Sequence, residues 1–161
     1  MAQIAQWLAT AAMAGMMLPG LATAQTADGS AVKAAADRFA ADIMWRPATV
    51  IEADFNCTGK VQPAILGMSE KQIAVAIFTQ GLNQPPALVR FDVDGRNPQA
   101  SKIRVDDYSL SAEEIAGVSG ATPTGYRPST TCHGVRLSDD SYEAAHIYWD
   151  HDNQRFETWA Q

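Results

Sequence analysis

The chain has 161 residues, with 12 Lys and Arg against 18 Asp and Glu, and a formal net charge of −6 at neutral pH. This balance argues against nucleic acid as a partner, because nucleic-acid binding depends on basic residues that neutralise phosphates. For the same reason it argues against binding to an anionic membrane surface.

The first 24 residues have the features of a signal peptide. Residues 1–24 contain no charged side chain and are rich in Ala, Met and Leu. The small residues of Ala22-Thr23-Ala24 stand where signal peptidase requires them, so we expect cleavage before Gln25. A second apolar run of about twenty residues is absent, so we expect no membrane association after cleavage. The sequence therefore predicts a periplasmic or secreted protein whose residues 25–161 form a single domain.

The first predicted element of this domain is an amphipathic helix. It is expected to begin at a cap on Ser30 and to end near Met44. Pro47 stops the helical pattern, because the residue before a proline is disfavoured in the α conformation. The apolar residues of this segment share one helical face, which consists of Val32, Ala35, Ala36, Phe39, Ala40 and Ile43.

From residue 49 onward the sequence predicts short strands, because apolar and polar residues alternate and turn residues separate the runs. So many short strands leave no room for crossover helices, so we expect antiparallel pairing. The predicted fold class is α+β, with the N-terminal helix packed on a twisted antiparallel sheet or small open barrel that carries one disulfide. The expected strands are Thr49–Cys57, Val61–Leu66, Gln72–Thr79, Ala87–Val93, Lys102–Leu110, Thr131–Leu137, Ala144–Trp149 and Arg155–Trp159.

A short helix and a long loop interrupt the series of predicted strands. The segment Ser111-Ala112-Glu113-Glu114 has the form of a capping box and predicts a short helix to about Ala116. A loop from Gly117 to Pro128 follows, and loops of this length in a compact domain are often functional.

Part of this loop, Ser119-Gly120-Ala121-Thr122, resembles the signature of the periplasmic FMN-binding domains of membrane redox complexes. In that family a flavin phosphate is joined to the threonine. The chain has Ala116 where the family has an aspartate, and Pro123 where the family continues into a helix. The resemblance implies FMN attachment at Thr122, which is the third of three functional hypotheses.

The two cysteines of an exported chain predict one disulfide, Cys57–Cys132. It closes a loop of about 75 residues and stabilises the fold by roughly 4 kcal/mol in the chain-entropy model. A bridged Cys132 cannot serve as a thiolate ligand or nucleophile.

All three histidines lie close together in the C-terminal part of the chain, which raises the possibility of a zinc or copper site. In one register of the expected hairpin, Arg136 pairs with His146, which places His133 and His146 on opposite faces of the sheet. A one-residue shift places both histidines on one face but about 13 Å apart, too far for one ion. A smaller group near one end of the sheet, His133, Asp150 and His151, remains as a candidate metal site. It supports a second functional hypothesis, a divalent-metal-binding or redox protein.

The leading hypothesis is a non-catalytic binding protein, possibly an inhibitor, with a protein, small molecule or carbohydrate as its ligand. Alternation in the last hairpin sends His146 and Tyr148 to one face and Trp149 to the other. The expected exposed binding surface consists of His146, Tyr148, Arg136 and Tyr126 of the loop. Tyr, Trp and Arg are the side chains that commonly anchor such interfaces. Catalysis is less favoured, since no serine lies in a nucleophile motif.

Overall fold

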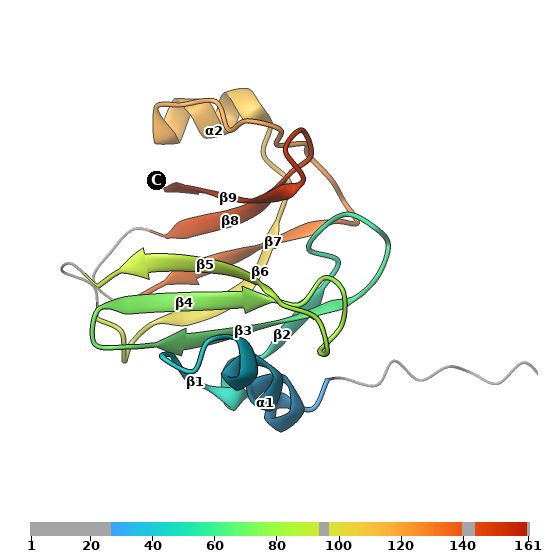
Figure 1. The fold of residues 1–161 in the computed structure, drawn as a ribbon. Helices are drawn as coiled ribbons and strands as arrows, with labels where there is room; N and C mark the ends of the chain where they lie inside the picture. The colour runs from blue at the N-terminus through green and yellow to red at the C-terminus, as the bar shows by residue number, and fades with distance from the viewer. Residues whose placement is uncertain (1–26, 94–96, 140–143, 161) are drawn as a thin grey trace, which may run out of the picture.

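Two antiparallel sheets packed face to face, with a helix at each end of the stack, make up the fold (Figure 1). The computed structural model describes residues 27–93, 97–139 and 144–160, so the predicted signal peptide lies outside the described residues. The elements in chain order are α1 (Gly29–Phe39), β1 (Met44–Trp45), the 3-10 turn η1 (Pro47–Thr49), β2 (Ile51–Ala53), β3 (Gln62–Met68), β4 (Gln72–Ile77), β5 (Ala87–Asp92), β6 (Lys102–Asp107), α2 (Ala112–Ser119), β7 (His133–Ser138), β8 (Ala145–Asp150) and β9 (Arg155–Ala160).

The first sheet has the order β1-β3-β4-β5, and β2 also pairs with β3. Strands β3 and β4 are buried along nearly their whole length. Their sequences are therefore almost continuously apolar, because α1 covers one face and the second sheet covers the other. This α+β arrangement, with antiparallel pairing throughout, confirms the predicted fold class.

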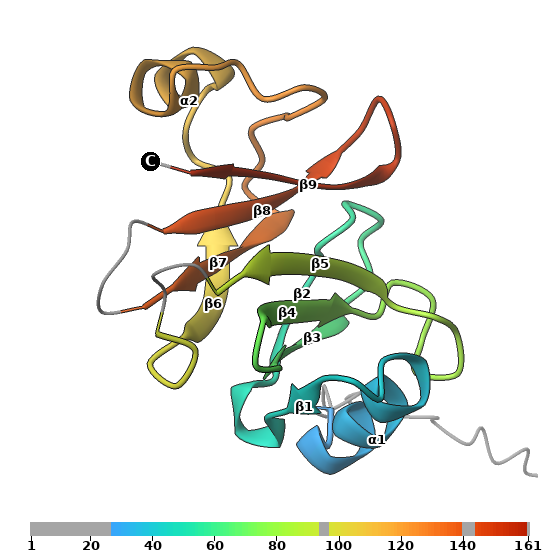
Figure 2. The ribbon, with the colours of Figure 1, turned by 60° about the vertical axis from the view of Figure 1, so that its left-hand side comes forward.

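The second sheet is a meander in the order β6-β7-β8-β9. Its inner face contributes Val135, Leu137 and Ile147 to the core between the sheets, where they meet Phe55 and Leu66 of the first sheet. Its outer face points away from this core, toward α2 and the loop that follows it (Figure 2).

The predicted N-terminal helix is present, but both of its predicted ends are wrong. Asp28, not Ser30, is the N-cap, and its carboxylate accepts a hydrogen bond from the Ser30 amide at 3.0 Å. The helix ends at Phe39, after which the chain turns so that Trp45 can pack against β3. The close fit explains Gly67 in β3, where a Cβ would lie 2.5 Å from the Trp45 ring.

The predicted strand Thr49–Cys57 is shorter in the structure, because its residues are needed for turns at both ends. Pro47–Thr49 form the 3-10 turn, and the strand itself covers only Ile51–Ala53. The Asp54 carboxylate then accepts hydrogen bonds from the amides of Thr58 and Gly59, which reverses the chain direction before β3.

The predicted disulfide Cys57–Cys132 is present, with the two Cα atoms 4.9 Å apart. It joins the turn after β2, in the first sheet, to the residue before β7, in the second sheet. Beside it the His133 amide donates to the Asp54 carbonyl at 2.9 Å. The bridge therefore holds the two sheets together at one edge.

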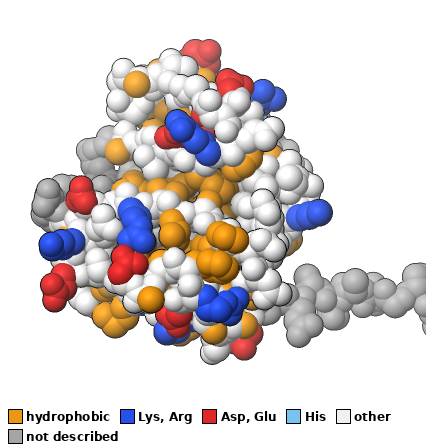
Figure 3. All heavy atoms as spheres, in the orientation of Figure 1, with side chains coloured by type: hydrophobic (Ala, Val, Ile, Leu, Met, Phe, Trp, Pro, Cys, Tyr) orange, Lys and Arg blue, Asp and Glu red, His pale blue; other side chains and the backbone are white. Residues whose placement is uncertain are grey.

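The surface seen in the orientation of Figure 1 carries acidic and basic side chains scattered around a central hydrophobic area, with no continuous patch of one charge (Figure 3). None of the helices in the described ranges is long and apolar enough to cross a membrane.

Candidate functional site

A pocket of about 410 Å³ lies on the outer face of the second sheet. The strand register places Arg104, Arg136, His146 and Trp159 in one row across β6, β7, β8 and β9. Residues of the chain after β6 and Tyr126 of the long loop complete the wall. The pocket is lined by Arg104, Val105, Asp106, Asp107, Tyr108, Ser109, Leu110, Tyr126, Arg136, His146 and Trp159.

The pocket contains a histidine that is hydrogen-bonded to an aspartate. His146 is 6% exposed, and its Nδ1 lies 2.6 Å from Oδ2 of Asp106. The Trp159 ring stacks on the imidazole with 3.8 Å between centroids and 3° between planes. An ionised carboxylate only accepts hydrogen bonds, so we place the ring proton of the neutral imidazole on Nδ1. Nε2 is then an acceptor, and it has no hydrogen-bond partner among the described residues.

Two arginines stand side by side at this pocket. Arg104 and Arg136 are directly paired across β6 and β7, and both are exposed. Neither guanidinium forms an ion pair or hydrogen bond with another described side chain, since the nearby Asp106 is bonded to His146. Like charges directly opposite each other in a sheet are destabilising. The same pocket is also lined by Asp106 and Asp107, so the positive potential that an anion would relieve is confined to the two guanidinium groups.

A cluster of three tyrosines, Tyr108, Tyr126 and Tyr148, supports the pocket from beneath the loop. The ring centroids of Tyr108 and Tyr126 are 5.2 Å apart, and those of Tyr126 and Tyr148 are 5.7 Å apart. The hydroxyl of Tyr126 donates to the Leu110 carbonyl, and that of Tyr148 donates to the Thr124 carbonyl, each at 3.0 Å. Burial raises the pKa of Tyr126 and of Tyr148 to about 12, so both hydroxyls keep their protons at neutral pH and fasten the loop to the sheet.

Three of the four residues of the expected binding surface, Arg136, His146 and Tyr126, line this pocket together. Of the two hairpin registers considered from the sequence, the structure has the one that pairs Arg136 with His146. The expected exposure of His146 and Tyr148 is wrong, since they are 6% and 3% exposed. The loop after α2 packs over this face, and Tyr148 supports the tyrosine cluster instead of lining the pocket.

Arg104, Asp106 and Trp159 were not among the predicted site residues. The first two lie on β6, which the chain separates from β7 by a helix and a long loop. The sequence offers no turn that fixes the β6–β7 register, because only a tight hairpin does so. The one available signal was the polar alternation of Arg104 and Asp106 along a predicted strand.

The structure does not bring His133, Asp150 and His151 together as a metal site. In the described parts of the chain, no group of three His, Cys, Asp or Glu side chains is arranged to hold a metal. Nδ1 of His133 lies 3.4 Å from Asp107, while the His151 amide donates to the Gly125 carbonyl. The Asp150 carboxylate accepts hydrogen bonds from the Asp152 amide and from both nitrogens of Asn153, so it shapes the turn between β8 and β9.

Asp150 should make the stability of the protein depend on pH. Hydrogen bonds from the Asn153 side chain and from the turn amides hold the pKa of this buried carboxyl below its ordinary value. A carboxyl with a lowered folded pKa stabilises the fold above its unfolded pKa of about 4, and this stabilisation disappears as the pH falls through the folded pKa. We expect Asp150→Asn to unfold at a lower temperature than the wild type at pH 7.

The difference in unfolding temperature should shrink steadily as the pH falls below about 4. The control is Asp92→Asn, which removes an exposed carboxylate on β5 and should not change the unfolding temperature at pH 7 or at the acidic pH values. A difference for Asp150→Asn that stays constant down to pH 2 would contradict this role.

Thr122 lies exposed in the loop beyond α2. Helix α2 ends before it, at the left-handed C-cap Gly120. The structure therefore has a helix before the threonine, where the resemblance to the FMN-binding domains implies one after it.

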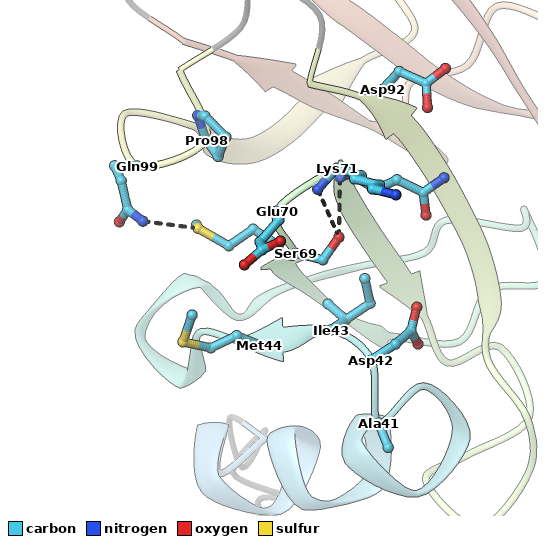
Figure 4. Close-up of a pocket in the computed structure, with 12 residues that line it drawn as sticks. Ala41, Asp42, Ile43, Met44, Ser69, Glu70, Lys71, Asp92, Pro98 and Gln99 are labelled. Carbon is cyan, nitrogen blue, oxygen red and sulfur yellow. Dashed lines mark hydrogen bonds between the residues drawn. The ribbon is translucent and has the colours of Figure 1, made fainter.

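A larger cavity of about 940 Å³ lies between β1, the β3–β4 turn and the segment before β6 (Figure 4). Ile43 and the exposed Met44 form part of its lining, and Ser69 accepts hydrogen bonds from the amides of Lys71 and Gln72. Asp42 is paired with Arg90 at 3.0 Å. Among its described lining residues no buried polar atom lacks a hydrogen-bond partner. The smaller pocket does contain such an atom, Nε2 of His146, and is therefore the better candidate for a ligand site.

Comparison with known proteins finds no match to this chain among family models, curated proteins or solved structures.

Proposed function

We propose that the protein is an exported, non-catalytic binding protein whose outer pocket takes a small organic anion. The disulfide is consistent with an oxidising compartment outside the cytoplasm, and the predicted signal peptide supports the periplasm or the medium as that compartment. The observation that carries the proposal is the pair Arg104 and Arg136, which lie side by side in the lining of a pocket that contains His146 and form no ion pair with a described acidic side chain.

The chemistry of the lining favours an organic anion over an inorganic one. A guanidinium binds a carboxylate through two parallel hydrogen bonds, which gives both affinity and orientation. Leu110, Tyr126 and Trp159 provide apolar surface beside the arginines. The volume of about 410 Å³ is within the range typical of small-molecule sites.

A binding role suits the pocket better than catalysis. The Asp106–His146 pair has the arrangement of a general base, but a base also needs a nucleophile within hydrogen-bond reach. Ser109 lines the pocket, yet it forms no hydrogen bond with His146, whose Nε2 has no partner among the described residues. This supports a binding role over catalysis, because no nucleophile among the described residues is hydrogen-bonded to His146.

Removing either arginine should weaken binding of the probe succinate. We expect Arg104→Gln and Arg136→Gln each to raise the Kd measured by titration calorimetry about tenfold or more, because a charge-assisted hydrogen bond contributes about 1.5–3 kcal/mol. The control is Arg38→Gln, which makes the same change on α1, at the opposite end of the stack. The proposal fails if the wild type does not bind succinate, or if all three variants bind it with the wild-type Kd.

A further inference from the structure

We infer that the pocket selects organic acids that carry a free hydroxyl group close to the carboxylate. This inference rests on the proposed function and adds the ligand class. It combines two features of one row of the sheet, the anion-binding side chain of Arg136 and the acceptor Nε2 of His146 directly opposite it on β8.

The unpartnered Nε2 is the first step of the argument. A polar atom buried without a hydrogen bond costs about 1–3 kcal/mol, so proteins keep few of them. The side chain of His146 is 8% exposed, and Asp106 fixes its ring with the proton on Nδ1. Stacking on Trp159 prevents the ring from turning toward another partner. In this orientation Nε2 is a hydrogen-bond acceptor, and its natural complement is a ligand hydroxyl.

The distance between the two groups is the second step. Side chains directly opposite each other on neighbouring antiparallel strands have Cβ atoms about 4.5–5.5 Å apart. A carboxylate bound by Arg136 and a hydroxyl donated to His146 therefore belong to one small molecule. The hydroxyl is then expected on the carbon that bears the carboxylate or on the next one.

Access to Nε2 is the third step, since this atom is closed to water in the unliganded pocket. Its cross-strand neighbour Arg136 is exposed and has a long, flexible side chain with no partner among the described side chains. The inference requires Nε2 to become accessible when Arg136 moves onto the ligand carboxylate. Binding of the anion and contact with Nε2 thus occur together.

The test compares malate, in both enantiomers, with succinate, which has the same charge and carbon chain but no hydroxyl. We expect the wild type to bind one malate enantiomer about tenfold more tightly than succinate in titration calorimetry, because a site built for a hydroxyl penalises the ligand that lacks it. In His146→Asn the preference should disappear, so that the ratio of the Kd values for succinate and malate falls to about one. Asparagine retains a donor to Asp106 at the position of Nδ1 and has no atom at the position of Nε2.

A second measurement needs no variant. Nitrogen-15 NMR of the histidine rings should show Nε2 of His146 unprotonated in the free wild type, and malate, not succinate, should shift its resonance. Equal affinities for malate and succinate, with both weakened by Arg136→Gln, would overturn this inference and leave the proposed function standing. Absence of binding by either acid would overturn both. A malate preference that survives in His146→Asn would also overturn the inference.

Discussion

Removal of the disulfide is expected to lower the free energy of unfolding by about 4 kcal/mol, which is a large part of the 5–15 kcal/mol that is typical of a domain. The bridge joins Cys57 and Cys132, which are 75 residues apart, so it restricts a large part of the unfolded chain. It also ties the turn after β2 to the start of β7, beside the hydrogen bond between His133 and Asp54. Urea denaturation of the double variant Cys57→Ala/Cys132→Ala at pH 7 measures the effect.

Two outcomes check this interpretation of the disulfide. The wild type under reducing conditions should lose about the same free energy as the double variant, because both lack only the cross-link. The change should appear in the denaturation midpoint, with the two-state transition retained. A double variant within 1 kcal/mol of the wild type would show that packing between the sheets holds this edge without the bridge.

Gly134→Ala is expected to destabilise the protein by about 2–3 kcal/mol, the cost of forcing an extra methyl group into a filled space. A Cβ on Gly134 would lie 2.5 Å from the Ile147 carbonyl oxygen on β8 and 2.7 Å from the Tyr108 ring. The ring cannot move freely, because the Trp149 amide donates to its hydroxyl at 2.8 Å. Tyr108 also lines the pocket, so this variant should bind succinate more weakly as well.

The matched control makes the same substitution in an open position. Gly117 lies in α2, and no atom is within 4 Å of the place where its Cβ would be. We expect Gly117→Ala to stabilise the protein by about 0.5–1 kcal/mol, since alanine is the better helix former. Both variants are measured by urea denaturation. Equal stabilities for the two would contradict the tight packing of Tyr108 over β7.

The local elements of this chain could be predicted because each has its own signal. The capping box of α2 is an example, since the Ser111 side chain accepts from the Glu114 amide and Glu114 accepts in return from the Ser111 amide. The hairpin of β7 and β8 is another, because alternation predicts both strands and which residues of each strand share a face. These patterns involve residues close together in the chain.

The candidate site could be predicted only in part. Arg136, His146 and Tyr126 were identified, since two of them share a hairpin and the third lies in a conspicuous loop. Arg104 and Asp106 come from a strand that pairs with β7 across a long excursion of the chain. No periodicity in the sequence relates them to His146, so the pairing of His146 with Asp106 could not be foreseen.

The sequence by itself determined where most helices and strands lie, though not where they end, together with the antiparallel class and the disulfide. These depend on short-range periodicity, on turn residues and on there being only two cysteines. The tertiary structure alone decided how the strands divide into two sheets and which face the loop after α2 covers. It also decided that Asp106 meets His146 beside two arginines that face each other across β6 and β7. These features depend on packing between residues far apart in the chain, where burial and strand pairing across long connections outweigh local preference.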